Sequence, residues 1–276
     1  MVSVVEPYYG DDEAYDAYRR RKEPEWRDLF SRLRRYLRRP GAPMNRDSEA
    51  RVLDIGCARG YSTAVARELG FDAYGVEPSA ADAQYARDEL GLPVRTGTLE
   101  QAGFAAGFFD AVVMWSVLEH LSAPMTTMAE IARILRPGGI VNIFTPNGDS
   151  RAARAQGAAW IEYNRPGHVV LFSPATVRRL LAAHGLQPLE IYTTLGGGAQ
   201  ENIRAGEQVI RSIRARRALP LRTCSPVHLI RSLAMRPGLA PLRRRVRRVI
   251  AALAPRAASA GEYMGVYGEK RLEERS

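Results

Sequence analysis

Short apolar runs alternate with helical patterns through the middle of the chain. Runs rich in aliphatic and β-branched residues predict buried strands, and segments whose apolar residues recur every three to four positions predict amphipathic helices. The strands are expected at 51–55, 72–76, 93–96, 110–114 and 140–144, and the helices at 62–69, 80–90 and 124–135. This alternation indicates an α/β protein with a doubly wound, mostly parallel sheet.

The segments on either side extend this core. Residues 1–40 predict a helix, because their apolar positions follow helical spacing. A further helix at 174–184 precedes a strand at 189–194. The apolar alternation at 262–268 predicts an antiparallel partner for that strand, which makes it the last of seven. The residues between these two would then form an insertion between two edge strands.

Four parts follow from this pattern. We expect a helical N-terminal cap at 1–45, an α/β core at 46–194, an arginine-rich helical insertion at 195–261, and a final strand and tail at 262–276. The net charge of +10 belongs to the last quarter, because residues 201–276 hold 17 of the 40 Lys and Arg but only 6 of the 30 Asp and Glu. A near-neutral core argues against nucleic acid as the partner of the whole protein.

The insertion itself has three open interpretations. Its segment PLRRRVRRVIAALAP (241–255) carries an apolar helical face flanked by arginines. It could be a solvated cover over the sheet edge, a surface that binds an anionic membrane, or a site for an anionic acceptor or partner. The sequence makes no prediction about the oligomeric state.

The cellular setting follows from the cysteines and the apolar stretches. Cys57 and Cys224 are too few for a disulfide framework. The first residues carry acids where a signal peptide has a basic and then an apolar run. No apolar stretch approaches the roughly 18 residues of a spanning helix. We therefore expect a cytoplasmic protein, with peripheral membrane contact as an alternative.

The first chemical signal is the turn from Asp54 to Gly60, which joins a strand to a helix. Small residues there let a ligand approach the backbone, and the helix start supplies N–H groups. Dinucleotide folds use the same geometry with G-x-G-x-x-G. Here Asp54 stands two residues before Gly56, where a carboxylate would repel a pyrophosphate but suit an ammonium group. The turn therefore favours an amino-acid-bearing nucleoside over NAD, with an undecorated structural turn as the alternative.

A second signal is Glu77, at the end of the next strand. An acid at this position can accept hydrogen bonds from both ribose hydroxyls. Glu77 follows Asp54 by 23 residues, at the tip of the adjacent strand, which favours a ribose contact over a solvated strand-end carboxylate.

The motifs VLDIGCARGYS, YGVEPS, TGTLE, FDAVVMWSVLEHL, LRPGG and IFTPN resemble, in this order, those of class I S-adenosylmethionine-dependent methyltransferases. They are most similar to the subgroup of ubiquinone-biosynthesis O-methyltransferases and sugar and natural-product methyltransferases. The resemblance runs from about residue 50 to 194. It implies a Rossmann-like fold and methyl transfer from S-adenosylmethionine, with S-adenosylhomocysteine as product. The implied acceptor is a small molecule, with a hydroxyl of a natural product, sugar or quinol-like intermediate favoured.

The resemblance also assigns cofactor contacts. It places Asp54, Gly56, Cys57 and Gly60 on the methionine and ribose side, Glu77 on the ribose, Pro78, Thr98 and Leu99 around the adenine, and Trp115 and Ser116 near the methionine and sulfonium. Tyr15, in a segment that often folds over the cofactor in this family, would form part of a lid, with an exposed amphipathic helix as the alternative for this segment. Ala58 departs from the family's glycine, and we expect it to be harmless if its φ is negative.

Candidates for the chemistry of the acceptor are few, because the chain has four histidines. We expect His168, in a polar and aromatic loop, to act as general base or to orient the acceptor, with Trp160 and Tyr163 lining the pocket. His120 is a second catalytic candidate, because it closes the loop after Trp115. We interpret His184, at a helix end, as structural. No metal-ligand spacing is present, so the reaction is expected to be metal-free.

Two other activities stay open on the same residues. One is a protein of this fold that binds S-adenosylmethionine but catalyses a cyclisation or isomerisation. The other is an RNA methyltransferase that recruits its substrate through the arginine-rich segment.

Overall fold

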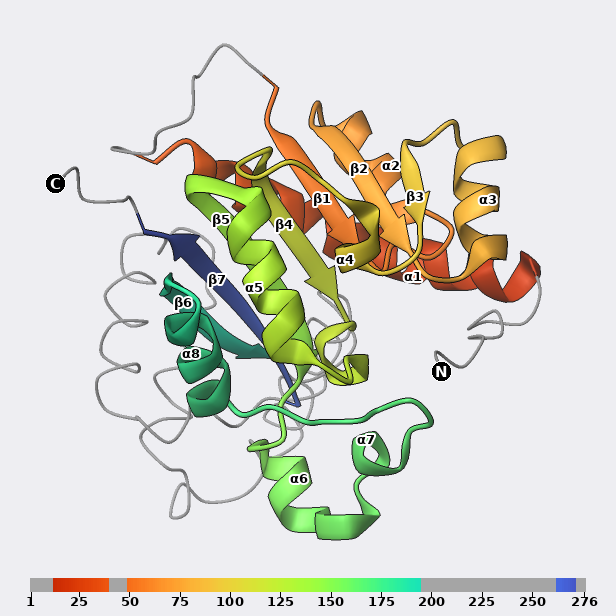
Figure 1. Cartoon of the computed structure of the whole chain (residues 1–276). Coiled ribbons are helices and arrows are strands. Elements are labelled where there is room, and N and C mark those ends of the chain that lie inside the picture. The colour runs from red at the N-terminus through yellow and green to blue at the C-terminus, as the bar shows by residue number, and fades with distance from the viewer. Residues whose placement is uncertain (1–11, 40–48, 195–261, 272–276) are drawn as a thin grey trace, which may run out of the picture.

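The computed structural model describes residues 12–39, 49–194 and 262–271. These residues contain a single seven-stranded sheet with helices on both faces, in the strand order β3-β2-β1-β4-β5-β7-β6 (Figure 1). The strands are β1 (Arg51–Ile55), β2 (Asp72–Glu77), β3 (Val94–Thr96), β4 (Phe109–Trp115), β5 (Leu135–Pro146), β6 (Leu186–Thr194) and β7 (Tyr263–Lys270). The predicted Rossmann-like α/β fold with an antiparallel last strand is confirmed.

Helices connect and cover these strands. The longer ones are α1 (Asp12–Leu37), α2 (Tyr61–Glu68), α3 (Ala80–Asp88), α5 (Pro124–Ile134) and α8 (Pro174–Ala183). The shorter ones are α4 (Leu99–Ala102), η1 (Leu118–His120), α6 (Arg151–Gln156), η2 (Gly157–Ala159) and α7 (Ile161–Asn164). The last three lie between β5 and α8, a stretch where the hydrophobic pattern gives no regular period.

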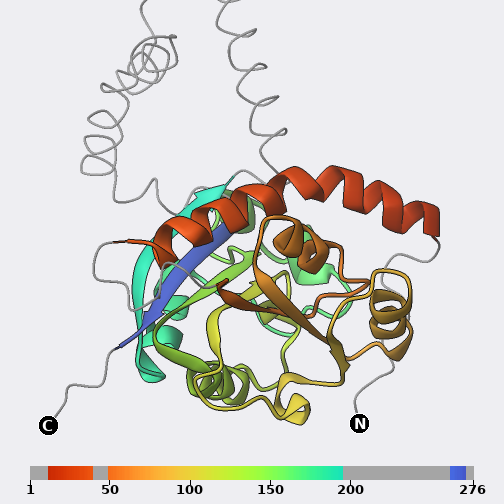
Figure 2. The same ribbon diagram turned by 90° about the horizontal axis from the view of Figure 1, so that it is seen from above.

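The sheet is buried from both sides (Figure 2). On one face α1 and α2 pack against the strands, with Phe30 and Leu33 of α1 buried beside Val113 of β4. On the other face α4, α5 and α8 pack, with Met128 of α5 beside Val112. The helix that the sequence predicts as a cap therefore contributes one side of the main core. Apolar burial of this kind stabilises by about 25 cal/mol per Å².

The position of β7 differs from the expectation. The sequence pattern places 189–194 and 262–268 as edge strands, whereas β7 lies inside the sheet and pairs antiparallel with both β5 and β6. Its first residue, Tyr263, is in register with Pro146 of β5 and Thr194 of β6. An inner strand must be apolar on both faces, and β7 is buried from Met264 to Gly268.

The arginine-rich insertion lies outside the described residues, so its three interpretations stay predictions. Among the residues that the structure describes, no helix is both long and apolar enough to cross a membrane.

The topology determines where a ligand can bind. Strands β1 to β5 are parallel, so their carboxyl ends meet at one edge of the sheet. The chain winds from β1 outwards to β3 and then crosses to β4 on the other side of β1. Crevices at such a reversal, outside the carboxyl ends of the strands, are where ligands of open α/β sheets bind.

Candidate functional site

The turn after β1 is built by glycines that no other residue could replace without movement. Gly56 has φ of 67°, and a Cβ there would lie 2.6 Å from Cγ2 of Val117. Gly60, the N-cap of α2, has φ of 79°, and a Cβ there would lie 2.6 Å from Cδ1 of Leu92. Both glycines adopt the left-handed conformation that costs glycine little. The glycines therefore let the turn pack closely against Val117 and Leu92 at the carboxyl edge of the sheet.

Ala58 lies in the same turn, and its φ is positive, so the condition under which we expect it to be harmless is not met. Its φ is 47°, in the left-handed region that L-residues with a Cβ rarely adopt. The backbone N–H of Ala58 donates to Oε2 of Glu77 over 2.9 Å. This hydrogen bond to Glu77 therefore helps to keep Ala58 in its strained left-handed conformation.

Asp54 is buried at the end of β1 with 3% of its surface exposed. The hydroxyls of Ser62 and Thr63, in the first turn of α2, donate to its carboxylate, the second over 3.0 Å. Burial raises the pKa of Asp54 to about 6, and these two hydrogen bonds oppose the shift. A bound ammonium group would favour the charged form of this carboxylate.

Glu77 is held at the end of β2 with 8% exposed. Its Oε2 accepts from the N–H of Ala58, and its Oε1 accepts from the N–H of Ser79 over 2.8 Å. Burial raises the pKa of Glu77, although both backbone hydrogen bonds favour the charged form. Each carboxylate oxygen can accept a further hydrogen bond. Pro78, next to it, is exposed at the rim.

Three other predicted cofactor residues occupy different environments. The side chain of Cys57 is buried under β2 and packs against Ala83 and Val94, so only its backbone faces the turn. Thr98 is the N-cap of α4, and its hydroxyl accepts from the N–H of Gln101. Leu99 is buried as the first residue of α4, where a helix leaves the N–H without a partner inside the helix.

Trp115 and Ser116 lie where β4 ends. Trp115 stacks on Phe144 of β5 with ring centroids 4.1 Å apart, and Phe144 stacks in turn on Tyr263 of β7 at 5.5 Å. Ser116 has φ of 53°, and its N–H donates to the carbonyl of Phe144 over 2.8 Å. An aromatic row therefore crosses the carboxyl edge from β4 to β7.

Helix α1 reaches this edge through Tyr15, which is 1% exposed. Its hydroxyl donates to both carboxylate oxygens of Asp82 over 3.0 and 3.1 Å. The guanidinium of Arg59, in the turn after β1, lies 3.8 Å from the centroid of the Tyr15 ring. The sequence pattern singled out Tyr15 but neither Arg59 nor Asp82, because the cluster joins three separate elements.

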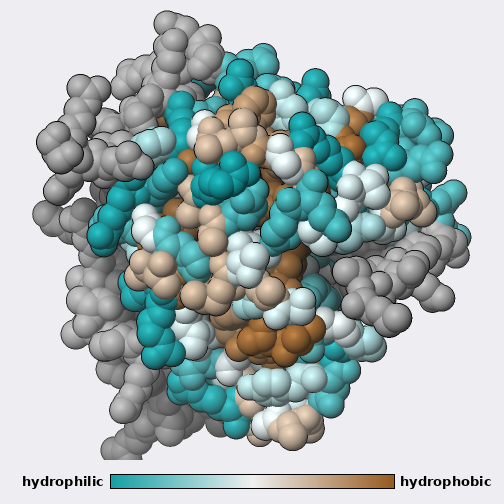
Figure 3. Space-filling view, viewed as in Figure 1, coloured by the Kyte–Doolittle hydropathy of each residue, from teal (hydrophilic) through white to brown (hydrophobic). Residues whose placement is uncertain are grey.

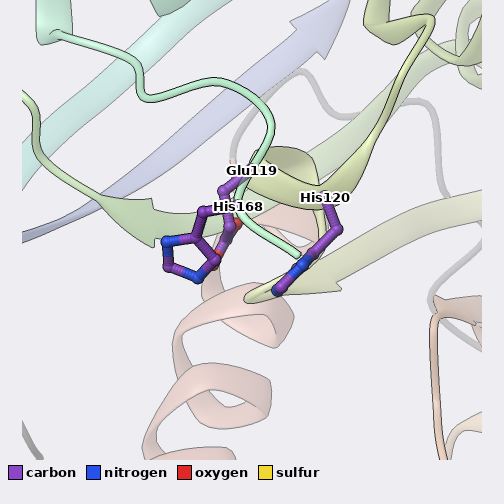
Figure 4. A group of neighbouring side chains, drawn as sticks. All are labelled: Glu119, His120 and His168. Atoms are coloured by element: carbon purple, nitrogen blue, oxygen red, sulfur yellow. The ribbon is translucent and has the colours of Figure 1, made fainter. Parts of the chain in front are cut away.

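His120 and His168 come together although 48 residues separate them. Their rings meet edge to face with centroids 4.8 Å apart (Figure 4). Nδ1 of His120 donates to the carbonyl of Gly167 over 2.9 Å, and Nδ1 of His168 donates to the carbonyl of Glu162 over 2.8 Å. Burial lowers the pKa of both histidines. Each neutral ring then carries its lone pair on Nε2.

Glu119 is a residue that the sequence argument missed. Only 1% of it is exposed, and its Oε2 accepts from the hydroxyl of Thr145 on β5 over 2.9 Å. Burial raises its pKa to about 7. Its backbone carbonyl accepts from the N–H groups of Val169 and Val170, which ties the His168 loop to η1. The sequence does contain a signal for Glu119: it directly precedes His120, shortly after the end of a predicted strand.

The aromatic loop is built around a second buried acid, Glu162. It is 4% exposed, pairs with Arg165, and accepts from the hydroxyl of Tyr263 over 2.9 Å. Trp160 is 2% exposed and packs edge to face on Tyr163, which is 49% exposed. Trp160 therefore supports the loop from below, and Tyr163 faces outwards.

His184 lies apart from this group. His184 follows α8 directly, and its Nδ1 donates to the carbonyl of Leu180 over 2.8 Å. His228 is outside the described residues.

The family comparison agrees with this geometry. The sequence model described as "Methyltransferase domain" matches residues 18–191, more than half of the chain. This chain belongs to the class I S-adenosylmethionine-dependent methyltransferases. Its cofactor is accordingly S-adenosylmethionine. The two buried carboxylates beside the glycine turn fit a ligand that carries an ammonium group and a ribose.

Curated relatives of the methyltransferase include two ubiquinone biosynthesis O-methyltransferases. The protein of Rhizobium etli (strain CIAT 652) is 30% identical over 148 residues, which cover 50% of this chain and 60% of that protein. The protein of Maricaulis maris is 34% identical over 119 residues, which cover 40% and 47%. The chain therefore matches about half to three fifths of the length of these relatives.

Solved structures share the fold of the methyltransferase. A possible histamine N-methyltransferase from Thermotoga maritima has a TM-score of 0.55 at 17% identity, over 94% of this chain and 95% of that one. A methyltransferase from Archaeoglobus fulgidus has the same score and identity, over 93% and 99%.

The left-handed Ala58 predicts a stabilising substitution. Ala58→Gly should raise the free energy of unfolding by about 1 kcal/mol, since relief of the left-handed strain exceeds the added entropy of the unfolded chain. Urea denaturation of both proteins measures the change. Ala64→Gly, inside α2, is the matched control and should lower stability by about 1 kcal/mol. A loss of stability in both variants would contradict the strain.

The burial of Asp54 predicts that the site lowers the free energy of unfolding by an amount that depends on pH. Because its folded pKa of about 6 exceeds its unfolded value, its contribution to stability is present below about pH 4 and is lost as the pH rises through about 6. Asp54→Asn should therefore be more stable than the wild type at about pH 8, by roughly 1–3 kcal/mol, with a smaller difference at about pH 5. Urea midpoints at both pH values test this. The exposed Asp88→Asn should show no such trend, and an equal gain for Asp54→Asn at both values would be the opposing result.

Proposed function

We propose that this methyltransferase transfers the methyl group of S-adenosylmethionine to an oxygen atom of a small-molecule acceptor, which binds beside His120 and His168. The observation that carries the proposal is the pair of imidazoles at the carboxyl edge. Both have Nδ1 tied to a backbone carbonyl, so both Nε2 atoms are hydrogen-bond acceptors. Such a pair suits a hydroxyl group that must be oriented and relieved of its proton.

The cofactor residues in this proposal are those that the sequence assigns. Asp54 would bind the ammonium group and Glu77 the ribose hydroxyls, because both carboxylates are buried at the edge and held by hydrogen bonds. The backbone of Gly56, Cys57 and Gly60 would line the methionine and ribose, and the N–H of Leu99 would meet the adenine. Tyr15, Pro78, Thr98, Trp115 and Ser116 complete the proposed set. The bound cofactor supplies a methyl group on a sulfonium.

The acceptor pocket in this proposal lies next to the aromatic row. Tyr163 and His168 would line it, with His168 and His120 orienting the hydroxyl. The sequence also assigns Trp160 to this lining, but Trp160 is buried and would instead support Tyr163 from below. Figure 3 shows hydrophobic side chains gathered in the lower half of the face that carries the site. Ile161 and Val169 are 63% and 64% exposed. An apolar rim supports an aromatic or lipid-like acceptor, as the names of the ubiquinone relatives suggest.

If Glu77 binds the ribose hydroxyls, its removal should weaken cofactor binding. Glu77→Ala should weaken the binding of S-adenosylmethionine and S-adenosylhomocysteine by about 1–3 kcal/mol, as for a lost hydrogen bond to a charged group. Titration calorimetry measures both affinities. Glu89→Ala, an exposed acid at the end of α3, should leave them unchanged. Equal affinity of Glu77→Ala and wild type would remove the ribose role, and no binding to the wild type at millimolar ligand would remove the proposal.

Oxygen specificity predicts a choice between matched acceptors. A hydroquinone with an alkyl chain should yield a methyl ether, while its amino analogue of the same shape should yield little product. Mass spectrometry identifies the product, and S-adenosylhomocysteine release gives the rate. Tyr163→Ala should raise the KM for the hydroquinone without changing cofactor affinity. Methylation of the amine alone would overturn the choice of oxygen.

A further inference from the structure

Glu119, His120 and His168 form a compact group of three metal-ligating side chains, called here the Glu-His-His cluster. One donor atom from each lies within 4.8 Å of the other two. Glu119 and His120 belong to η1, and His168 comes from the segment between α7 and α8 (Figure 4). The sequence predicted no metal site, because His168 follows His120 by 48 residues and Glu119 by 49.

Both histidines are oriented as metal ligands are. A ligating histidine almost always donates its second ring N–H to a carbonyl or carboxylate, which fixes the ring and leaves the other nitrogen for the metal. Nδ1 of His120 donates to the carbonyl of Gly167, and Nδ1 of His168 donates to the carbonyl of Glu162. His168 has a carboxylate oxygen of Glu162 3.7 Å from the same Nδ1. The same arrangement on two adjacent rings is the outer shell that a metal site requires.

The carboxylate of Glu119 is buried beside the two imidazoles. It is almost fully buried and receives a hydrogen bond from the neutral hydroxyl of Thr145. The guanidinium of Arg165, in the neighbouring loop, makes an ion pair with Glu162, and its charge also acts on Glu119. A carboxylate buried away from water needs a cation or several hydrogen bonds to stabilise it. A divalent ion between Glu119 and the two imidazoles would provide that charge.

We propose that Glu119, His120 and His168 bind one divalent transition-metal ion, and that this ion binds the oxygen of the methyl acceptor. Two imidazole nitrogens and one carboxylate suit an ion such as Zn²⁺, whereas Mg²⁺ and Ca²⁺ prefer oxygen ligands alone. Three protein ligands leave a position for a further ligand, as catalytic zinc sites do. The proposal rests on the proposed function, because it assigns the acceptor to this edge.

The ion would explain how a hydroxyl becomes a nucleophile here. An oxygen bound to a divalent metal loses its proton more readily, and the proton leaves to water. The acceptor oxygen then forms a bond to the methyl carbon, and the carbon–sulfur bond breaks with its electron pair left on sulfur. In this arrangement the metal–oxygen bond replaces the direct hydrogen bonds from the acceptor hydroxyl to Nε2 of His120 and His168. The two histidines then orient the acceptor through the metal and do not act as bases.

The direct test is metal binding by the full chain. Protein stripped with a chelator and titrated with Co²⁺ should develop visible absorption bands that saturate and that Zn²⁺ abolishes. His168→Ala and Glu119→Gln should each weaken this Co²⁺ binding by more than about 100-fold, because the loss of an outer-shell partner alone costs about 10–100-fold. His184→Ala is the matched control, since His184 also donates Nδ1 to a backbone carbonyl but lies in another part of the fold. It should bind Co²⁺ as the wild type does.

Three results would overturn the metal site or its role. Absence of a saturable Co²⁺ spectrum in the wild type, or equal Co²⁺ affinity in the wild type and in His168→Ala and Glu119→Gln, would exclude it. If Glu119→Gln is misfolded by circular dichroism, His120→Asn replaces it with the same expectation. Full methyl transfer by the stripped protein would exclude the acceptor role.

The proposed function has separate readouts. It fails if S-adenosylmethionine does not bind or if no hydroxyl is methylated, even where Co²⁺ binds normally.

Discussion

Burial of the central strands on both faces is the constraint on which the site depends. A polar side chain in the middle of β1 or β4 would lose its hydration without a partner, which costs several kcal/mol. Acids and hydrogen-bonding groups are therefore placed where the strands end. Asp54, Glu77 and Glu119 are buried at or directly after the carboxyl ends of β1, β2 and β4. The polar side chains of the site lie together at the carboxyl edge because the buried middle of each strand offers them no hydration.

The same constraint explains which residues the sequence could predict. The predicted cofactor residues from Asp54 to Ser116 lie at the ends of β1 to β4 or just after them. A hydrophobic run in the sequence marks each of these strands, so the position of each residue follows from the run that precedes it. The Glu-His-His cluster is different. It is assembled by backbone hydrogen bonds, such as Val169 to the carbonyl of Glu119, which any residue type could make. Nothing in the side-chain pattern records such a bond, so the partnership of Glu119 with His168 could not be predicted.

The buried acids also relate stability to function. The raised pKa values of Asp54 and Glu77 mean that the folded protein holds these groups charged at a cost when no cation is near. Perturbed groups of this kind cluster at functional sites. The left-handed Ala58 adds strain in the same turn. This edge is therefore the least favourable part of the core for stability, and ligand binding is expected to offset part of that cost.

The last strand connects the edge of the sheet to the acceptor loop. The hydroxyl of Tyr263 donates to Glu162, whose carbonyl in turn accepts from His168, so β7 helps to hold the histidine. Tyr263 is also in register with Thr194, the last residue of β6. The described chain therefore leaves and re-enters the sheet at adjacent points of this edge. Whatever residues 195–261 bind, they are joined to the fold beside the site where the acceptor is expected.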